Sequence, residues 1–274
     1  MICLGVRGHD YGKDSPERLF RRIRGDGFGS VQLAFRKAVA GVEQFGDITP
    51  AVLENVKKAS DTQKIHIAVL GAYMEIALAD DSLREKNLGE FIGNIPFAAA
   101  LGADCIGTET TRRELQPHTT RKEALRALFR SLERAMPIAE EKGVTVAIEP
   151  VASHTVNTPE CAASVLKTAA SPNLSVIFDP VNLLTAENLS DQDDLWKRFF
   201  NLLGDKIAAV HMKGVRLGPD GKLAGCGFSD SAVDYRFLFR ELRKLPQNYS
   251  VLREEIDPRN AKEDYRFLHD LACG

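Results

Sequence analysis

The stretch VAIEPVASH, residues 146 to 154, joins a short apolar run to a carboxylate. Val146, Ala147 and Ile148 are typical of a buried strand, yet Glu149 ends that run and Pro150 closes it. Burying an ionised carboxylate without a partner is strongly unfavourable. We therefore expect Glu149 to be paired, hydrogen-bonded or bound to a metal ion.

Similar apolar runs recur along the chain and alternate with longer amphipathic stretches, which is typical of βα units around a parallel sheet. Helix starts are marked by Ser-Pro or Thr-Pro pairs at 15–16, 49–50 and 158–159 and by a capping box at Thr120 and Glu123. The expected strands are 2–7, 30–35, 66–73, 105–110, 144–149, 174–179, 207–212 and 250–254.

Eight strands, each followed by a helix, in a chain of 274 residues predict a single (β/α)8 TIM barrel, with 1–274 as one domain. A doubly wound open sheet is the alternative, and it usually carries a glycine-rich phosphate turn after an early strand. GVRGHDYG, residues 5 to 12, has neither the GxGxxG spacing nor the acid that follows it. The barrel is therefore preferred.

Composition narrows the class of protein. The formal net charge is −2 and the basic residues are scattered, so no nucleic-acid footprint is expected. Five widely spaced cysteines without a CxxC pair indicate a reducing compartment. No apolar run approaches a membrane span and the N-terminus does not read as a signal peptide. These features predict a cytoplasmic enzyme or binding protein.

The functional residues of such a barrel lie where the strands end and the following loops begin. Because side chains alternate along a strand, Glu149, Asp179 and His211 should point inward at the ends of three consecutive strands. In the last strand, alternation does not decide whether Glu254 or Glu255 points inward. An inward Glu254 requires Arg253 to lie among the helices, where it would have to snorkel toward water. Either glutamate completes three carboxylates and one imidazole.

Such a donor set suits one divalent ion, Mn²⁺, Co²⁺, Mg²⁺ or Zn²⁺, because clustered carboxylates repel one another without a cation. The alternative is an internal salt-bridge network with Lys213 that binds no metal. Position alone also makes six residues on this face candidates for contact with a substrate. They are Arg7, His9, Glu109, His154, Asn182 and Lys213.

The motifs AIEP (147–150), FDPVN (178–182) and HMKG (211–214) make the sequence resemble the sugar isomerases and epimerases with a xylose isomerase-like barrel. This family includes ketohexose 3-epimerases and inosose dehydratases. It holds its metal with Glu, Asp, His and Glu on the last four strands. The resemblance therefore implies Glu149, Asp179, His211 and Glu254 as metal ligands, with Glu254 preferred to Glu255 and with Glu149 and Glu254 also transferring a proton.

Two positions depart from the family pattern. Many members carry a histidine three residues after the aspartate, where this chain has Asn182, and many epimerases place an acid after the first glutamate, where this chain offers His154. Both changes bear on the substrate and leave the expected metal ligands intact.

The resemblance implies a divalent-metal-dependent isomerase or epimerase that acts on a ketose or related polyol by proton transfer through a metal-bound enediolate. An inosose-type dehydratase would use the same site. An endonuclease IV-like DNA-repair nuclease would need further histidines at other strand ends, which the sequence lacks. We expect a small sugar or polyol as partner, no nucleic acid and no membrane, and leave a homo-oligomer open.

Overall fold

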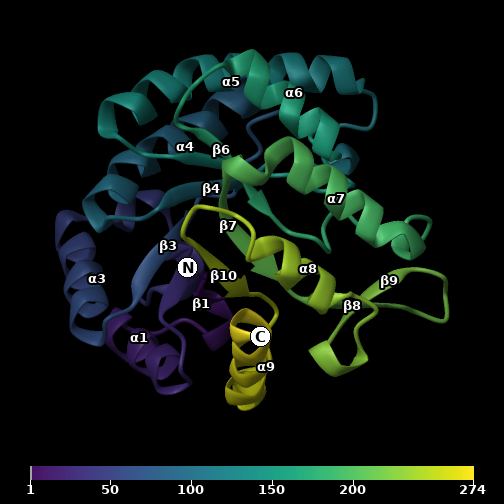
Figure 1. The fold of residues 1–274 in the computed structure, drawn as a ribbon. Coiled ribbons are helices and arrows are strands. Elements are labelled where there is room, and N and C mark those ends of the chain that lie inside the picture. Colours follow the sequence, from purple (N-terminus) through teal and green to yellow (C-terminus); the bar gives the residue numbers. More distant parts are fainter. Residues whose placement is uncertain (1) are drawn as a thin grey trace.

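Eight parallel strands close into a barrel in the computed structural model, which describes residues 2–274. Going around the barrel, the order is β1, β10, β7, β6, β5, β4, β3, β2, so each strand lies beside its neighbours in the chain (Figure 1). The (β/α)8 barrel is confirmed. Its strands are β1 (Ile2–Arg7), β2 (Ser30–Leu33), β3 (His66–Gly71), β4 (Cys105–Glu109), β5 (Val146–Glu149), β6 (Leu174–Phe178), β7 (Ile207–Met212) and β10 (Tyr249–Arg253).

Helices surround the barrel and begin where the sequence signals place them. Ser15, Thr49 and Thr158 cap helices whose first residue is proline, and Thr120 forms the expected capping box with Glu123. The helices are α1 (Pro16–Gly25), α2 (Phe35–Ala38), α3 (Pro50–Gln63), α4 (Asp81–Leu101), α5 (Arg121–Lys142), α6 (Pro159–Ala169), α7 (Gln192–Leu203), α8 (Tyr235–Leu242) and α9 (Ala261–Cys273).

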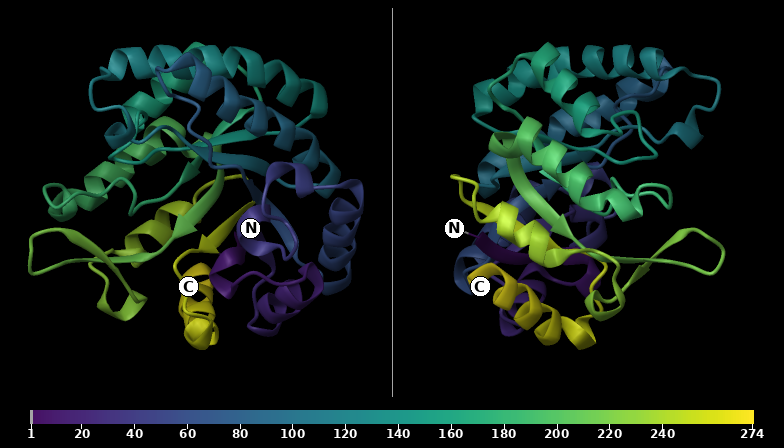
Figure 2. Two further views of the ribbon diagram at one scale, coloured as in Figure 1. Left: turned by 180° about the vertical axis from the view of Figure 1, so that it is seen from behind. Right: turned by 45° about the vertical axis from the view of Figure 1, so that its right-hand side comes forward.

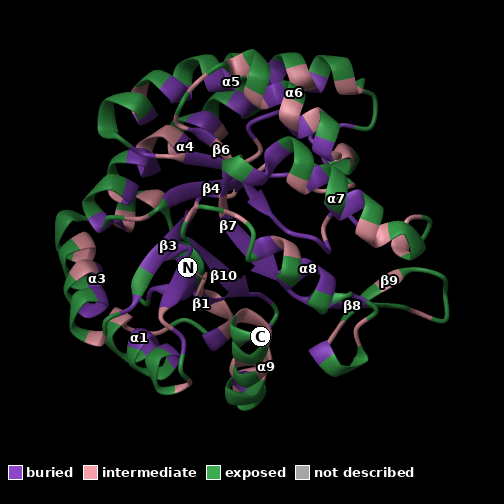
Figure 3. Cartoon of the chain, viewed as in Figure 1, coloured by how far each residue is buried: buried purple, intermediate pink, exposed green. Residues whose placement is uncertain are grey.

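The apolar side chains form two separate clusters, as the alternation along the strands predicts. One cluster lies inside the barrel, and the larger one fills the layer between strands and helices. Figure 3 shows the barrel strands mostly buried and the outward faces of the helices mostly exposed. In β5, Ala147 belongs to the inner cluster, whereas Val146 and Ile148 belong to the outer one. The complete inner cluster is Ala68, Val69, Cys105, Ala147, Ile177, Ala209 and Leu252.

Several strands are shorter than expected, for local reasons. β2 ends at Leu33, because the chain turns there into the short helix α2 that begins at Phe35. β5 begins at Val146, because the side-chain amide of Asn173 donates to the carbonyl of Val144 at 2.9 Å and occupies it. The polar residues at the barrel mouth therefore sit just at, or just beyond, the strand ends.

A β-hairpin that the sequence analysis did not predict follows β7. It pairs β8 (Gly214–Leu217) with β9 (Leu223–Cys226) in antiparallel fashion and projects from the body of the molecule (Figures 1 and 2). Close backbone approach requires glycine at Gly214, where an added Cβ would lie 2.5 Å from the carbonyl oxygen of Cys226. Within residues 2–274, no helix has the length and apolar character needed to cross a membrane.

Candidate active site

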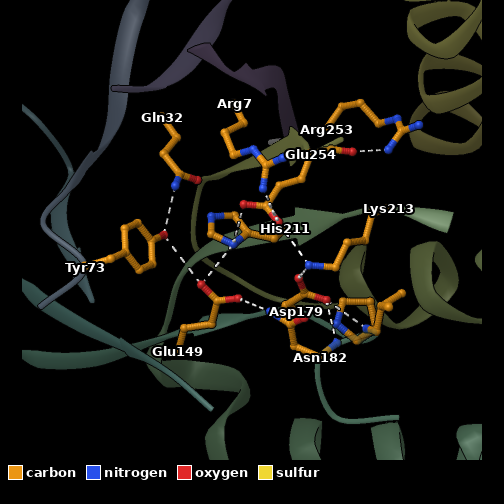
Figure 4. A network of polar contacts seen from close by, with 12 residues as sticks. Arg7, Gln32, Tyr73, Glu149, Asp179, Asn182, His211, Lys213, Arg253 and Glu254 are labelled. Atoms are coloured by element: carbon orange, nitrogen blue, oxygen red, sulfur yellow. Dashed lines mark hydrogen bonds and ion pairs between the residues drawn. The ribbon is translucent and has the colours of Figure 1, made fainter. Parts of the chain in front are cut away.

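Three consecutive strands of the barrel bring Glu149, Asp179 and His211 together. Glu149 is the last residue of β5, Asp179 follows β6, and His211 lies near the end of β7. Each is at most 1% exposed, and one potential ligand atom from each lies within 4.8 Å of the others (Figure 4). These three buried side chains could hold a metal ion.

His211 stands between two carboxylates. Its Nδ1 lies 3.1 Å from Oε2 of Glu149 and 3.4 Å from Oε1 of Glu254. Among residues 2–274, neither ring nitrogen finds a hydrogen-bond partner of good geometry. Burial alone would lower the pKa of His211, but the charges of Glu254 and Glu149 raise that pKa to about 9. In the absence of metal the imidazole therefore carries a proton at neutral pH.

Asp179 is oriented by the backbone that follows it. Its Oδ1 accepts hydrogen bonds from the N–H groups of Val181 (2.8 Å) and Asn182 (2.9 Å), which leaves Oδ2 facing the cluster. The Nζ of Lys213 lies 2.8 Å from Oδ2. Burial raises the pKa of Asp179, and the Lys213 ammonium opposes that rise. One carboxylate oxygen is thus fixed by the protein and the other is available to a cation.

Glu149 is held by neighbours on both sides. The side-chain amide of Asn182 donates to Oε1 at 2.6 Å, and the hydroxyl of Tyr73 donates to Oε2 at 3.5 Å. Tyr73 itself accepts a hydrogen bond from Gln32 at 2.9 Å. Asn182 therefore orients Glu149.

The position of Arg253 shows which glutamate of the last strand, Glu254 or Glu255, faces the cluster. Arg253 points to the helix side, where its Nε lies 2.7 Å from Oδ2 of Asp264, its Nη1 donates to the Glu254 carbonyl, and its guanidinium covers the ring of Phe228. It is 3% exposed, so the expectation that it snorkels is wrong, because Asp264 supplies its counter-charge inside the protein. Glu254 consequently faces the cluster, and Glu255 is exposed.

Glu254 is surrounded by positive charge. Its Oε2 lies 3.1 Å from Nζ of Lys213 and 3.5 Å from Nη1 of Arg7. Burial alone would raise the pKa of Glu254, but His211, Lys213 and Arg7 together lower it to about 2. Glu254 is therefore ionised at neutral pH.

The donor set fits a divalent cation. Lys213 bridges Asp179 and Glu254 and supplies one positive charge, as in the salt-bridge network considered from the sequence. That network leaves Nε2 of the buried His211 without a hydrogen-bond partner among the described residues, and a purely structural network does not require this. Two oxygens and a nitrogen within reach of one point form a mixed set that Mn²⁺, Co²⁺ or Zn²⁺ binds.

A cavity of about 400 Å³, a size suited to a small ligand, adjoins this cluster and is lined in part by Asn182, Lys213 and Glu254. Five of the six residues expected to contact a substrate line it: Arg7, His9, Glu109, Asn182 and Lys213. The sixth, His154, is buried outside the lining, with Nδ1 3.7 Å from Oε2 of Glu109. Burial and the charge of Glu149 raise the pKa of Glu109 to about 7.

The sequence analysis did not assign the remaining lining residues to the site. Gln32 carried a usable signal, since it is a polar residue at an inward position of an apolar strand. Lys37 and Arg112 carried none, because they lie beyond the strands, where alternation does not apply. The residues not assigned are Gln32, Lys37, Tyr73, Met74, Glu75, Thr110 and Arg112, whereas Glu255 was considered as the alternative to Glu254.

Comparison with known proteins agrees with this architecture. The model of one protein family, described as xylose isomerase-like TIM barrel, matches residues 20–271. A search of curated protein sequences finds no significant match.

Solved structures share the fold at low sequence identity. A 3-keto-D-glucoside 4-epimerase from E. coli is 18% identical, with 98% of this chain and 100% of that chain covered and a TM-score of 0.75. A D-psicose 3-epimerase solved with D-fructose is 13% identical (99% and 100% covered, TM-score 0.76). The IOLI protein with a bound zinc atom is 16% identical (99% and 97% covered, TM-score 0.73). At these identities the likeness establishes the fold alone.

Proposed function

The chain belongs to the xylose isomerase-like TIM barrel family, and on that premise we propose that it is a metal-dependent sugar isomerase or epimerase acting on a ketose or related polyol. The observation that carries the proposal is the buried cluster of Glu149, Asp179 and His211 at the barrel mouth, with Glu254 against the same imidazole. The epimerases that share the fold support it. The proposal takes 1–274 as one domain.

In this proposal Glu149, Asp179, His211 and Glu254 hold one divalent ion, Mn²⁺, Co²⁺, Mg²⁺ or Zn²⁺. When bound, the ion supplies Lewis-acid polarisation of a substrate carbonyl and its neighbouring hydroxyl. His211 must give up its proton to become a ligand. The backbone N–H groups that fix Oδ1 of Asp179 hold the other oxygen toward the cluster.

Glu149 and Glu254 are the proposed proton carriers. Both approach Nδ1 of His211 but come from β5 and from the end of β10, so a ligand bound over His211 has a carboxylate from each of two separate strands. One carboxylate removes the proton from the carbon beside the carbonyl. The other group, which must be a carboxylic acid at that stage, returns its proton to the opposite face of that carbon to give an epimer. Delivery to the former carbonyl carbon, with the hydroxyl proton moving to the other oxygen, gives an aldose–ketose isomer.

The remaining roles are those of binding and orientation. Asn182 fixes Glu149 through its 2.6 Å hydrogen bond, and Arg7 lies beside Glu254. We propose that Arg7, His9, Glu109 and Lys213, which line the cavity, contact the hydroxyl groups of the substrate. His154 is proposed to orient Glu109 from behind.

The test is solvent exchange. Metal-supplemented protein is incubated with ketoses, their phosphates and inososes in deuterated water, and product and label are followed by NMR. We expect epimer or isomer with deuterium at the reacting carbon. Glu254→Gln should keep the shape of the site but lower the rate by about 10²- to 10⁴-fold. Glu255→Gln is the matched variant, and a loss as large as that of Glu254→Gln would contradict the assignment.

The same experiment separates the alternatives. Loss of a hydroxyl as water indicates an inosose-type dehydratase on the same site. Nicking of abasic-site DNA with no sugar turnover would support the endonuclease IV-like alternative and remove the proton-transfer roles of the two glutamates. Within residues 2–274 the structure offers one cluster of three potential metal ligands, whereas such a nuclease needs a multinuclear site, so the sugar enzyme is preferred.

A further inference from the structure

The positive charges that line the cavity fall into two groups. Arg7 pairs with Asp10 at 2.8 Å and lies 3.5 Å from Glu254, and Lys213 pairs with Asp179 and Glu254. Lys37 and Arg112, in contrast, form no ion pair with any acidic residue in the part of the chain that the structure describes. Lys37 and Arg112 are therefore two cations of the cavity lining without a direct ion-pair partner, although the charge of Arg112 also acts on Glu75 and Glu109.

These two cations lie away from the proposed metal ligands. Lys37 is on α2, just after β2, and Arg112 follows β4, so the two flank the end of β3. The metal-ligand candidates come from β5, β6, β7 and the end of β10. A substrate whose reacting carbon lies over His211 would therefore extend its far end toward Lys37 and Arg112.

Their chain neighbours are bound elsewhere. Arg36 lies 3.4 Å from Oε2 of Glu90, and Arg113 donates to the carbonyl of Thr119 at 2.5 Å. Neither Arg36 nor Arg113 lines the cavity. Of each consecutive pair of basic residues, one is engaged by the protein and the other faces the cavity.

We propose that the substrate carries an anionic group, a carboxylate or a phosphate, at the end remote from His211, and that Lys37 and Arg112 bind this group. The inference rests on the proposed function and specifies its substrate class. Arginine and lysine are the side chains that recognise carboxylate and phosphate, and arginine can bind either in bidentate fashion. Both side chains are exposed when the cavity is empty of ligand, so neither charge is buried at a cost before binding.

The charge of both residues acts within the cavity. Burial and Arg7 lower the pKa of His9 to about 4, with a contribution from Lys37, and burial and Arg112 lower the pKa of His154 to about 4. Both imidazoles are therefore neutral at physiological pH, and His9, which lines the cavity, can hydrogen-bond a hydroxyl group. Lys37 and Arg112 therefore supply the positive charge at this end of the cavity.

Two carboxyl groups, Glu75 and Glu109, lie on the same side of the cavity. Burial raises the pKa of Glu75, although hydrogen bonding to Thr111 and to the Arg112 backbone opposes the rise. Burial also raises the pKa of Glu109, followed by the charge of Glu149. The charge of Arg112 opposes the rise in both pKa values, so Arg112 acts electrostatically on this side of the cavity.

Arg216, on the hairpin after β7, is another basic residue near the barrel mouth that could be considered for binding an anion. It is exposed on β8 and does not line the cavity. The proposed anion site is therefore at the β2 and β4 ends of the barrel, not at the β7 loop.

The experiment measures binding by calorimetry with metal-loaded protein and three probes that share the same first five carbons. These are a ketohexose, its 6-phosphate and the corresponding 6-carboxylate. We expect one anionic probe to bind at least about tenfold more tightly than the neutral sugar, and the tighter of the two identifies the group. Lys37→Gln and Arg112→Gln should each weaken binding of that anion by about tenfold and change that of the neutral sugar by less than about twofold.

Arg36→Gln and Arg216→Gln remove the same charge outside the cavity and should leave all three affinities unchanged. Equal or tighter binding of the neutral ketohexose, no binding by either anion, or equal weakening by the control variants would each overturn the inference. Label exchange on the neutral sugar with no preference for anions would overturn the substrate class and leave the proposed function standing. Tight, Lys37-dependent binding of an anion without any label exchange would overturn the proposed function and leave the anion site standing.

Discussion

The two ends of the barrel each hold a histidine beside a carboxylate, in opposite environments. At the amino end of the strands, Nε2 of His66 lies 2.7 Å from Oδ2 of Asp104, with the two side chains 45% and 44% exposed. At the carboxyl end, His211 lies 3.1 Å from Glu149 and is fully buried. Both pairs join a histidine to an acidic residue, but the first pair is exposed to solvent and the second is buried.

The difference shows where the fold keeps unsatisfied polar groups. An exposed pair contributes little and costs little, because solvent solvates both partners. Burying three carboxylates, an ammonium and an imidazole at one point is expensive, and a fold has no structural need for it. The unfavourable arrangement of buried charges therefore lies at the end of the barrel where we propose the active site, and the solvent-exposed pair lies at the other end.

The largest effect should come from removing the imidazole at the mouth. His211→Ala should lose bound metal, measured by elemental analysis, and lower turnover by about 10²-fold or more, because it deletes a ligand. His66→Ala deletes the same side chain at the other end of the barrel and should keep both metal and turnover. Equal losses of metal and turnover in His211→Ala and His66→Ala, or retention of metal by His211→Ala, would contradict the proposed difference between the two ends.

A smaller effect is expected from Arg253, which supports the mouth from behind. Arg253→Met leaves Asp264 without its partner and frees the Glu254 carbonyl, so we expect a destabilisation of about 3 kcal/mol and metal binding weakened by about tenfold to a hundredfold. Arg259, which pairs with Asp257 at the surface, is the matched control, and Arg259→Met should leave the free energy of unfolding unchanged, because solvent screens this exposed pair. Chemical denaturation and metal titration measure both quantities. Unchanged metal affinity in the first variant would show that Glu254 does not depend on this support.

The pH dependence of metal binding sharpens the contrast further. The raised pKa of His211, about 9 without metal, means that a bound metal must displace a proton at pH 7. Metal affinity should therefore increase by up to about tenfold per pH unit from pH 7 and level off near pH 9. Calorimetry in two buffers with different ionisation enthalpies should detect the released proton. Affinity that is independent of pH across this range would exclude His211 as a ligand.

The smallest effect belongs to the exposed pair. Hydrogen bonding to Asp104 raises the pKa of His66 above its ordinary value, so the folded state binds the proton more tightly than the unfolded state does. The pair therefore stabilises the protein below the unfolded pKa, about 6.5, and this contribution is lost as the pH rises through the folded value. Because both side chains are exposed, the unfolding free energies of wild type and His66→Gln should differ by less than about 1 kcal/mol at low pH and converge at high pH. A difference that grows with pH would contradict the sign.

Much of the fold was predictable, because it follows from local signals. Proline after a capping residue starts helices at Pro16, Pro50 and Pro159, and strand alternation places Ala147 inside and Ile148 outside the barrel. The hairpin of β8 and β9 was missed because its strands are short and lie in what reads as a loop. Strand ends such as that of β5 depend on the side chain of Asn173, which no periodicity reveals.

The candidate site was predictable where alternation along strands applies. Glu149 and His211 follow from it directly, and the choice of Glu254 required Asp264, a distant residue that gives Arg253 a buried partner. Lys37 and Arg112 could not be predicted, since their place in the cavity depends on loop and short-helix geometry after the strands. The roles of these residues in catalysis and binding remain predictions for the experiments above.

The central claim, that the buried cluster at the mouth is a metal site for proton transfer, is tested most directly by metal removal. Protein is stripped with a strong chelator, its metal content is measured, and deuterium incorporation from solvent into a turned-over sugar is compared before and after a divalent ion is restored. The account predicts that label incorporation disappears with the metal and returns at about one ion per chain. Full incorporation by protein that contains no metal would contradict it.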